Sequence, residues 1–424
     1  MPHFARLRLS GWRQFQSVDI DLSAPVTVLT GSNGCGKTSI LTILSQHFGW
    51  SIHFVSTPFD SMSNSKRLYS EFRRVRRNRS ETASTAEVTV DFDDGIPPDQ
   101  GAERVGELIY SDGNTCTLTS QAKVASGPQY QIQYSQIRSV EGIYIPSHRP
   151  ATFYQAVTTI PANPRTTTQQ YSEYQQLLQQ LYQGSRGNSN PGTSMKQSLI
   201  ALAIFGYGNQ VVQPNAEYRS LFEAFQTVLR HVLPQSLGFH KLEIRVPEVV
   251  LITESGEFSL DAMSGGVNAL FTIAWQIQMS GWGKTACTVL IDEPENHLHP
   301  SMQRSLMPSL ARAFPEYRFV VATHSPFVVA SDPGAKVFAL THNSERLVES
   351  SLLDAANLAA SPDGILRDVL DVPSLMPIWA ESELRRIIDE HQHSASDPAA
   401  IDALFLRLKA LGLSASLPHV SRQG

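Results

Sequence analysis

The sequence predicts an α/β protein built around a mainly parallel sheet, and three observations lead to this prediction. Short apolar runs rich in β-branched residues alternate with stretches whose apolar residues recur every three or four positions, the pattern of strands separated by helices. A glycine-rich turn joins one such run to a helical stretch near the N-terminus. The 424 residues, of which 41% are hydrophobic and 17% charged, suffice for a large core and two or three modules.

The composition narrows the class of protein. The formal charge is 34 − 39 = −5, so no global basic field attracts nucleic acid, and any such contact must come from a local patch. Three widely spaced cysteines (Cys35, Cys116, Cys287) cannot form a disulfide framework and fit a reducing compartment. The N-terminus lacks a signal-peptide pattern, and no run approaches the roughly 18–20 apolar residues of a membrane span. We therefore expect a cytoplasmic protein without membrane contact.

The first 150 residues predict a lobe of short strands with one early helix. Phe4–Leu9 and Val18–Leu22 alternate with period 2, and Val26–Leu29 is a continuous apolar run before the glycine-rich turn. Residues 38–48 then have helical spacing. Further candidate strands are Val88–Phe92, Gly106–Tyr110, Tyr130–Tyr134 and Gly142–Ile145. We expect residues 1–150 to combine part of the parallel core with an antiparallel β-subdomain.

Three further segments follow along the chain. Residues 151–250 contain glutamine-rich and apolar-periodic helical stretches, which we interpret as an inserted helical lobe. Residues 251–345 return to alternating strands and helices and predict a second lobe of the parallel sheet. Residues 346–424 have amphipathic helical spacing. This tail is either an assembly or partner-docking segment or a helical cap on the sheet.

The glycine-rich turn is the first motif with chemical meaning. Residues 31–38, GSNGCGKT, match the phosphate-binding pattern G-x-x-x-x-G-K-[ST] and lie between a buried strand and a helix. Backbone amides at a helix N-terminus can surround phosphates there. We expect Lys37 to contact the β- and γ-phosphates and the Thr38 hydroxyl to bind magnesium. The remaining nucleotide-binding residues predicted here are Ser32, Asn33, Gly34, Cys35, Gly36 and Ser39.

A second motif ends the apolar strand Thr288–Ile291 with two carboxylates. The carboxyl ends of strands in an open α/β sheet are where ligands bind. Asp292 is placed to hold magnesium through water, and Glu293 to orient or deprotonate an attacking water. With a phosphate-binding loop upstream, the pair predicts hydrolysis of a nucleoside triphosphate.

Two shorter motifs complete the set. Ser264-Gly265-Gly266 opens a helix shortly before the Asp-Glu strand, and its hydroxyl, bare glycine amides and helix N-terminus form an anion site. Thr323-His324 follows another apolar strand and would place His324 beside the γ-phosphate.

In this order, GSNGCGKT, MSGGV, LIDEPENHLHP and VVATHSP resemble the SMC/RecF/OLD-like branch of ABC-type ATPases, as does the opening RLRLSGWRQFQSVDIDLS. The resemblance covers residues 1–50 and 255–345. It implies an ABC-type P-loop ATPase head that closes on ATP and magnesium as a head-to-tail dimer or higher homo-oligomer. One subunit's Ser264, Gly265 and Gly266 then face the γ-phosphate held by the other, because this motif does not reach its own subunit's nucleotide.

The same resemblance assigns three more features. Arg13 becomes a candidate contact to the nucleotide, and Glu295 and His299 fall in the dimer-contact turn after the catalytic glutamate. The branch also has a glutamine-bearing loop that senses magnesium, whereas the matching segment Tyr144–Arg149 lacks a glutamine. Many bacterial relatives belong to phage-defence operons and gate a toxic partner, which implies a separate nuclease or toxin as effector.

Two clusters stay open between a functional and a structural role. Seven basic residues within 66–79, with only Glu71 opposing them, either contact a nucleic-acid backbone or form a solvated face or a contact for an acidic partner. His297 and His299 could form a metal pair, although residues two apart share a face only on a strand. Structural or dimer-contact roles fit a turn better.

The expected function is magnesium-dependent ATP hydrolysis linked to a nucleic-acid process, either anti-phage defence or DNA repair. One alternative is the nucleotide-binding subunit of a membrane transporter. The separation of Lys37 from Ser264, 264 − 37 = 227 residues, and Val267 in place of a glutamine both disfavour it. Another is an ATP-binding scaffold that only sequesters a toxic partner. A fused nuclease is not expected, because no Asp-x-Asp pair follows Glu345.

Overall fold

The computed structural model describes residues 1–60, 67–70, 75–77, 90–92, 103–120, 124–125, 127–149, 154–161, 165–184, 190–354, 362–370, 372, 378, 380–382 and 386. The chain divides into two compact units, Met1–Pro362 and Asp363–Gly424. No helix among the described residues is long and apolar enough to cross a membrane.

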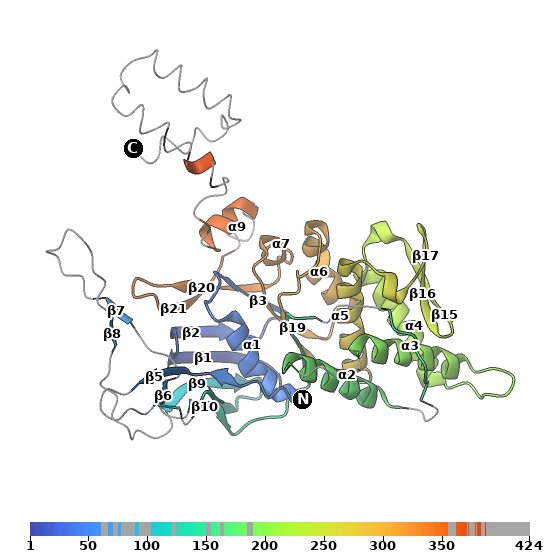
Figure 1. Cartoon of the computed structure of the whole chain (residues 1–424), viewed down its shortest axis with the longest axis horizontal. Coiled ribbons are helices and arrows are strands. Elements are labelled where there is room, and N and C mark those ends of the chain that lie inside the picture. Colours follow the sequence, from blue (N-terminus) through green and yellow to red (C-terminus); the bar gives the residue numbers. More distant parts are fainter. Residues whose placement is uncertain are drawn as a thin grey trace, which may run out of the picture. The chain divides into compact units, whose positions relative to one another are not determined.

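The first unit is built on an 11-stranded mixed sheet (Figure 1). Its strands, in spatial order, are β13 (Gln133–Ser135), β10 (Thr115–Ser120), β9 (Glu103–Tyr110), β1 (Phe4–Trp12), β2 (Phe15–Asp21), β21 (Val348–Leu352), β20 (Lys336–His342), β3 (Val26–Gly31), β19 (Arg318–Ala322), β18 (Thr288–Asp292) and β14 (Gly142–Ile145).

One half of this sheet is parallel and carries the motif residues. Strands β20, β3, β19, β18 and β14 pair in parallel with one another, in this order. All residues of β3 and β18 are buried, as expected for parallel strands covered on both faces. This confirms the predicted α/β fold with a parallel core.

The other half is antiparallel and alternates buried with exposed residues. Strands β1, β2, β9, β10 and β13 form the expected antiparallel subdomain. They are continuous with the parallel half because β21 pairs in parallel with β2 and antiparallel with β20. The segment expected to be helical from residue 346 therefore begins with a sheet strand.

Four helices pack against or follow strands of the parallel half. Helix α1 (Lys37–Ser45) packs against β3, β14, β18 and β19 and runs into the 3-10 turn η1 (Gln46–Phe48). Helix α5 (Gly265–Gly281), buried along nearly its whole length, contacts β14. Helix α6 (Pro300–Ala313) follows β18, and the short α7 (Pro326–Val329) follows β19.

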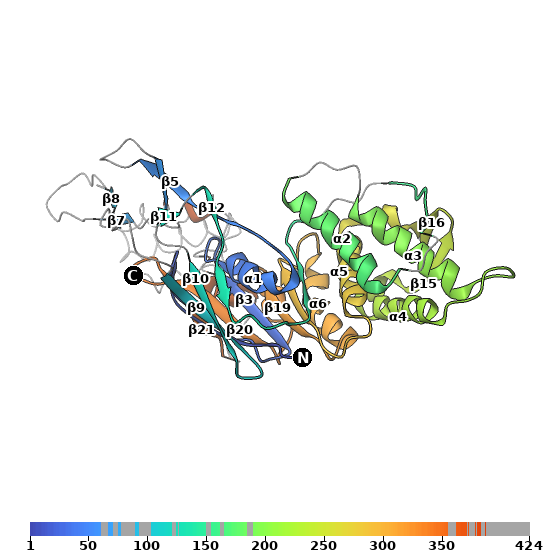
Figure 2. The same cartoon turned by 90° about the horizontal axis from the view of Figure 1, so that it is seen from below.

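The inserted lobe contains α2 (Thr167–Tyr182), α3 (Pro191–Tyr207) and α4 (Ala216–Val232), gathered beyond α5 (Figure 2). Sequence-encoded caps start them: a Thr166–Gln169 capping box for α2, and Asn190 and Asn215 side chains for α3 and α4. Beside them lies a three-stranded antiparallel sheet of β15 (Phe239–Arg245), β16 (Glu248–Thr253) and β17 (Gly256–Ser259), with the 3-10 turns η2 (Gln235–Leu237) and η3 (Leu260–Ala262) at its ends.

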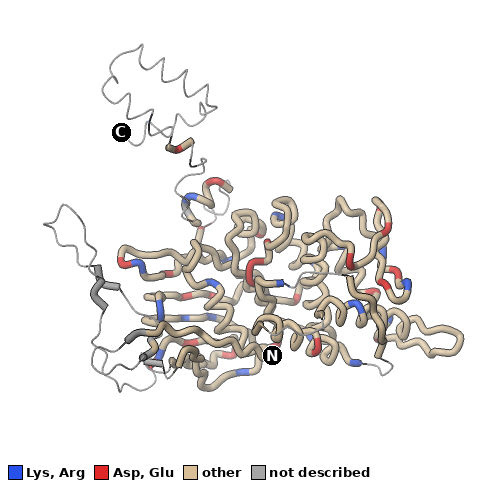
Figure 3. The backbone as a smooth tube through the Cα atoms, viewed as in Figure 1, with Lys and Arg blue, Asp and Glu red and all other residues tan. Residues whose placement is uncertain are grey.

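Small sheets and the C-terminal unit complete the described parts. The short strands are β4 (Phe54–Val55) with β12 (Gln129–Tyr130), β5 (Thr57–Asp60) with β6 (Arg67–Ser70) and β11 (Val124–Ala125), and β7 (Val75–Arg77) with β8 (Val90–Phe92). Helix α9 (Pro362–Asp368) opens the C-terminal unit. Four of the seven basic residues in the cluster 66–79 and most of the tail after residue 370 lie outside the described residues. On the described backbone, basic and acidic positions are interspersed (Figure 3).

Candidate active site

The phosphate-binding loop joins β3 to α1 and depends on two glycines. Gly31 has φ +141°, and a Cβ there would lie 2.3 Å from the Leu340 backbone oxygen. Gly36 has φ +94°, and its Cβ would lie 2.3 Å from the Phe15 ring. Any larger residue would both strain the backbone and collide with a neighbouring strand. The loop is thus closely packed between β20 and the start of β2.

Lys37 is buried and points back into the loop. Its Nζ donates to the Gly31 oxygen at 2.9 Å and the Ser32 oxygen at 3.1 Å, and lies 3.4 Å from His324 Nδ1. Burial lowers the pKa of this ammonium. Since it can only donate, His324 Nδ1 acts as the acceptor and His324 Nε2 carries the ring proton.

Thr38 and Asp292 meet where α1 passes the end of β18. The Thr38 hydroxyl donates to Asp292 Oδ2 at 3.0 Å. Asp292 is only 2% exposed, and burial raises its pKa to about 6. A hydroxyl and a carboxylate are hard oxygen donors of the kind magnesium prefers, and a buried carboxylate gains most from a nearby cation. The two side chains therefore fit the magnesium ion that the resemblance implies.

Glu293 has an unusual backbone conformation. Its φ of +46° is left-handed, which non-glycine residues rarely adopt outside special sites. Its amide donates to the Ala322 oxygen at 2.8 Å. Its carboxylate accepts from Asn296 Nδ2 at 3.0 Å through Oε2, while Oε1 lies 3.9 Å from His324 Nε2.

The turn that carries His324 is held by hydrogen bonds to Glu295. Glu295 Oε1 accepts from the Thr323 hydroxyl at 2.7 Å, the His324 amide at 2.7 Å and the Ser325 amide at 3.2 Å. Burial and the charge of Lys37 lower the pKa of His324, so the ring is neutral at pH 7. The resemblance implied a dimer contact for Glu295. Within this chain it fixes the turn that carries His324.

The β1–β2 turn reaches the loop through a residue that the sequence analysis missed. Gln14 Nε2 donates to the Gly34 oxygen at 3.3 Å. The neighbouring Arg13, with φ +51°, places its guanidinium 5.9 Å from the Trp12 ring centroid and 5.6 Å from that of Phe54. Arg13 Nε is buried without a hydrogen-bond partner among the described residues.

The Ser264–Gly266 motif makes no polar contact with the phosphate-binding loop among the described residues. Ser264 caps α5 by accepting from the Val267 amide at 3.4 Å. A Cβ on Gly266 would lie 3.0 Å from the His297 oxygen, so the motif packs against the turn after Glu293. Among the described residues, no hydrogen bond or ion pair links Ser264–Gly266 to residues 31–39.

The two histidines of that turn are exposed. His297 has φ +70°, and His299 caps α6 by accepting from the Ser301 amide at 3.3 Å. Within the described part of the chain, no group of three or more His, Cys, Asp or Glu side chains is arranged to hold a metal.

Arg149 and Asn296 are further residues near the site that the sequence analysis gave no role. Arg149 Nη2 donates to the Glu293 oxygen at 3.1 Å, and Asn296 Nδ2 lies 3.3 Å from the Ser147 oxygen as well as contacting Glu293. Two sequence signals pointed to Arg149: its place after the buried strand Gly142–Ile145, and its position in the segment Tyr144–Arg149 that matches the magnesium-sensing loop.

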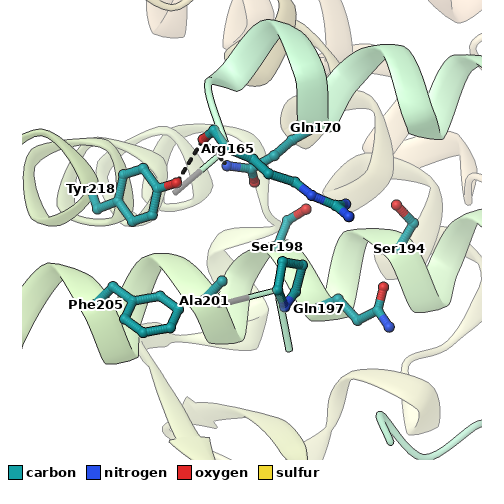
Figure 4. A pocket seen from close by; sticks show the side chains of 9 residues that line it. Arg165, Gln170, Ser194, Gln197, Ser198, Ala201, Phe205 and Tyr218 are labelled. Carbon is teal, nitrogen blue, oxygen red and sulfur yellow. Dashed lines mark hydrogen bonds between the residues drawn. The ribbon is translucent and has the colours of Figure 1, made fainter. Parts of the chain in front are cut away.

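A small cavity in the inserted lobe lies apart from these residues (Figure 4). It lies between α2, α3 and α4, where Tyr218 donates to the Arg165 oxygen at 2.7 Å. Its volume of about 10 Å³ holds at most one water. We therefore assign it no ligand.

Two families match the chain. One, described as "AAA domain", matches residues 6–181, which include the phosphate-binding loop. The other, described as "AAA domain, putative AbiEii toxin, Type IV TA system", matches residues 214–330, which include Ser264, Asp292, Glu293 and His324. The chain contains a P-loop ATPase domain. This confirms the ATPase character of the resemblance drawn from the motifs.

Curated relatives of this P-loop ATPase domain include three proteins with short regions of similarity. The Retron Vc95 probable ATPase of Vibrio cholerae serotype O1 biovar El Tor is 29% identical over 97 residues, 20% of this chain and 18% of that protein. The Retron Ec83 probable ATPase of Escherichia coli is 52% identical over 40 residues, 9% of this chain and 7% of that protein. The Septu protein PtuA of Bacillus mycoides (strain KBAB4) is 32% identical over 92 residues, 20% of this chain and 13% of that protein. The similar regions thus span at most 18% of these relatives' own lengths.

Among solved structures, the SMC head domain from Thermotoga maritima aligns with 83% of this chain and 99% of its own, at 14% identity and a TM-score of 0.43. The Smc head domain from Pyrococcus furiosus, bound to the C-terminal domain of ScpA, aligns with 87% of this chain and 100% of its own, at 14% identity and a TM-score of 0.43.

Proposed function

We propose that this protein hydrolyses ATP with magnesium. The observation that carries the proposal is the convergence of Lys37, Thr38, Asp292 and His324 from three separate segments on one edge of the parallel strands. The buried Lys37 ammonium, the Thr38 hydroxyl beside the Asp292 carboxylate, and the Glu293 carboxylate that follows it provide the donors and acceptors that phosphoryl transfer to water needs.

Each residue has a role in this proposal. Lys37 exchanges the Gly31 and Ser32 oxygens for phosphate oxygens, and the amides of Ser32–Ser39 surround the phosphates. Thr38 and Asp292 would hold magnesium, which neutralises the developing phosphate charge when bound. Glu293 orients the attacking water and accepts its proton. The neutral His324 donates from Nε2 toward the γ-phosphate.

We infer that the working form is a head-to-tail dimer. The Ser264–Gly266 motif lies at a helix N-terminus with two bare glycine amides, yet it has no bonded link to the loop of its own chain among the described residues. A second subunit could bring its own motif to the γ-phosphate, so that each ATP is held between two chains.

We further propose a role in anti-phage defence with a separate effector protein, a nuclease or a toxin. The support is the similarity to proteins named as retron ATPases and a Septu protein. The proposal includes contact with nucleic acid through residues 66–79, half of which lie outside the described residues.

Phosphate release from ATP by the purified chain tests the first proposal. We expect release that requires magnesium and that stops in Lys37→Ala, which removes the only side-chain cation in the loop. Lys336→Ala is the matched control, because that lysine pairs with Asp21 at the opposite end of β20. Equal activity of wild type and Lys37→Ala would point to a contaminating ATPase and refute the proposal.

A further inference from the structure

Arg149 lies where the chain leaves the edge strand of the parallel sheet. Strand β14 pairs in parallel with β18, with Ile145 opposite Ile291. Residues that follow β14 therefore leave the same sheet edge as Asp292 and Glu293, which follow Ile291. This puts the Arg149 side chain beside the turn that carries Glu293.

The guanidinium of Arg149 binds that turn through its backbone. Nη2 donates to the Glu293 oxygen at 3.1 Å, and Nη1 lies 3.5 Å from the Pro294 oxygen and 3.4 Å from the Asn296 oxygen. The first distance is that of an ordinary hydrogen bond and the other two are long. One planar fork thus spans both ends of a four-residue turn.

These partners are unusual for a half-buried arginine. A guanidinium removed from water normally pairs with a carboxylate. In the described part of the chain, Arg149 makes no ion pair within 4.0 Å, and its Nε is buried without a hydrogen-bond partner. Burial lowers its pKa to about 10, so it stays charged at neutral pH. Such an arrangement costs folding free energy, and residues of this kind concentrate at functional sites.

The Glu293 backbone needs this support. A left-handed conformation at a residue with a Cβ costs free energy and persists only when neighbours hold it. The Glu293 amide is held by Ala322 and its oxygen by Arg149. Asn296 then connects the Glu293 carboxylate to the Ser147 oxygen. Contacts from β19 and from the segment that follows β14, the two strands beside β18, therefore fix the position of Glu293.

We propose that Arg149 is a positioning residue that holds the turn after β18 so that the Glu293 carboxylate faces the attacking water. This inference rests on the proposed ATPase function. Arg149 does not touch the nucleotide or the metal in this assignment. It acts through Glu293, so its loss lowers turnover and leaves ATP binding in place.

The first experiment measures kcat, KM and ATP binding for Arg149→Ala and Arg149→Lys. A shift of about 1 Å in a reacting group can cost about 100-fold in rate, so we expect kcat to fall by about that factor in Arg149→Ala. ATP binding should be unchanged. Lysine keeps the charge but offers one nitrogen in place of the fork, so Arg149→Lys should recover only part of the rate. Arg318→Lys is the matched control. Arg318 also donates to a backbone oxygen, that of Ser23, but it lies at the amino end of β19, at the other end of the parallel strands from Glu293.

The second experiment adds Arg149→Ala to Glu293→Gln. If Arg149 acts through Glu293, the double variant keeps the residual rate of Glu293→Gln, whereas independent effects multiply. A multiplied loss, an unchanged kcat in both Arg149 variants, or a loss of ATP binding would overturn the assignment. Should Arg149→Ala fail to fold, Arg149→Lys carries both comparisons. An inactive wild type would overturn the proposed function and this inference with it, while an active wild type with a multiplied loss overturns only the inference.

Discussion

Single residues at the end of β18 have distinct environments. Asp292 is 2% exposed, whereas the Glu293 side chain, one position later, is 35% exposed. A buried carboxylate is costly unless a cation compensates it, which suits a magnesium ligand. A partly exposed carboxylate can reach a water molecule, which suits a general base. The left-handed turn at Glu293 separates the two roles within two residues.

This separation predicts the behaviour of Glu293→Gln. Glutamine keeps the size of the side chain and can still contact Asn296, but it cannot accept a proton from water. We expect ATP binding at the wild-type level and hydrolysis lowered by about 100-fold or more, the usual scale of general-base loss. Equilibrium binding of a fluorescent ATP analogue and single-turnover phosphate release measure the two effects. A wild-type rate of hydrolysis would contradict the role of Glu293.

Among the elements, the junction of α1 and η1 with the antiparallel strands contains a buried histidine. His47 contacts the Tyr110 hydroxyl at 2.9 Å through Nε2 and the Leu44 oxygen at 3.2 Å through Nδ1. It also stacks edge-on against Phe4 and Tyr134. Burial lowers the pKa of His47 from 6.5 to about 4.

The lower pKa of His47 in the folded chain makes the stability of the fold depend on pH. Below pH 6.5 the unfolded chain protonates His47 while the folded chain does not, so the free energy of unfolding falls as the pH drops toward 4. The loss approaches (6.5 − 4) × 1.36, or about 3 kcal/mol. We expect urea unfolding of His47→Gln to lose less stability than wild type between pH 7 and pH 4.5. His299→Gln, which changes an exposed histidine outside this cluster, is the control. Equal slopes for wild type and His47→Gln would contradict the prediction.

The elements also show which features a sequence can predict. The continuous apolar runs Val26–Leu29 and Thr288–Ile291 predicted strands β3 and β18, because a strand buried on both faces must be apolar throughout. The glycines at 31 and 36 predicted the loop, because only glycine fits its φ angles and close contacts. These signals are local and depend on a few residues.

The features of the site and the fold that the sequence did not predict depend on contacts between distant segments. Gln14 reaches Gly34, and Arg149 reaches Glu293, across 20 and 144 positions. A single glutamine or arginine after a strand has many possible partners, so spacing alone cannot assign one. Strand β21 was expected within a helical segment, since its residues, VESSL, lack a strong strand pattern. Its place is set by pairing with β2 and β20.

At the scale of the whole molecule, the proposed dimer predicts complementation between two inactive variants. Lys37→Ala removes the loop cation, and Ser264→Arg blocks the motif offered to the other subunit. Each pure variant should be inactive. Random pairing makes half of the dimers mixed, each with one intact site of two, so mixing should recover about a quarter of wild-type activity.

A matched control separates shared sites from simple mixing. The double variant Lys37→Ala/Ser264→Arg, mixed with wild type, leaves no intact site in a mixed dimer, because one site lacks the lysine and the other the serine. Its mixture should fall below the activity expected from wild type alone at the same dilution. Inactivity of the first mixture, with mixed dimers detected by mass measurement, would contradict the shared site.

The chain after β21 raises the question of whether the tail serves folding or assembly. All eleven strands of the large sheet end by Leu352, and the Leu353 amide donates to the Val337 oxygen at 2.9 Å. A chain ending near Thr341 would lose β21, which lies between β2 and β20, and would expose two strand edges. A chain ending at Asp354 keeps every strand of this sheet.

We expect the chain ending at Asp354 to fold and to hydrolyse ATP, because the sheet, the loop and the residues of the candidate site are all retained. If the tail is an assembly or docking segment, this chain will lose its higher oligomer or a co-purifying partner, which light scattering and pull-down measure against the full chain. A folded, active chain with unchanged assembly would contradict the docking role. An insoluble chain, with the full chain soluble under the same conditions, would show instead that the tail covers apolar surface that the first unit cannot leave exposed to water.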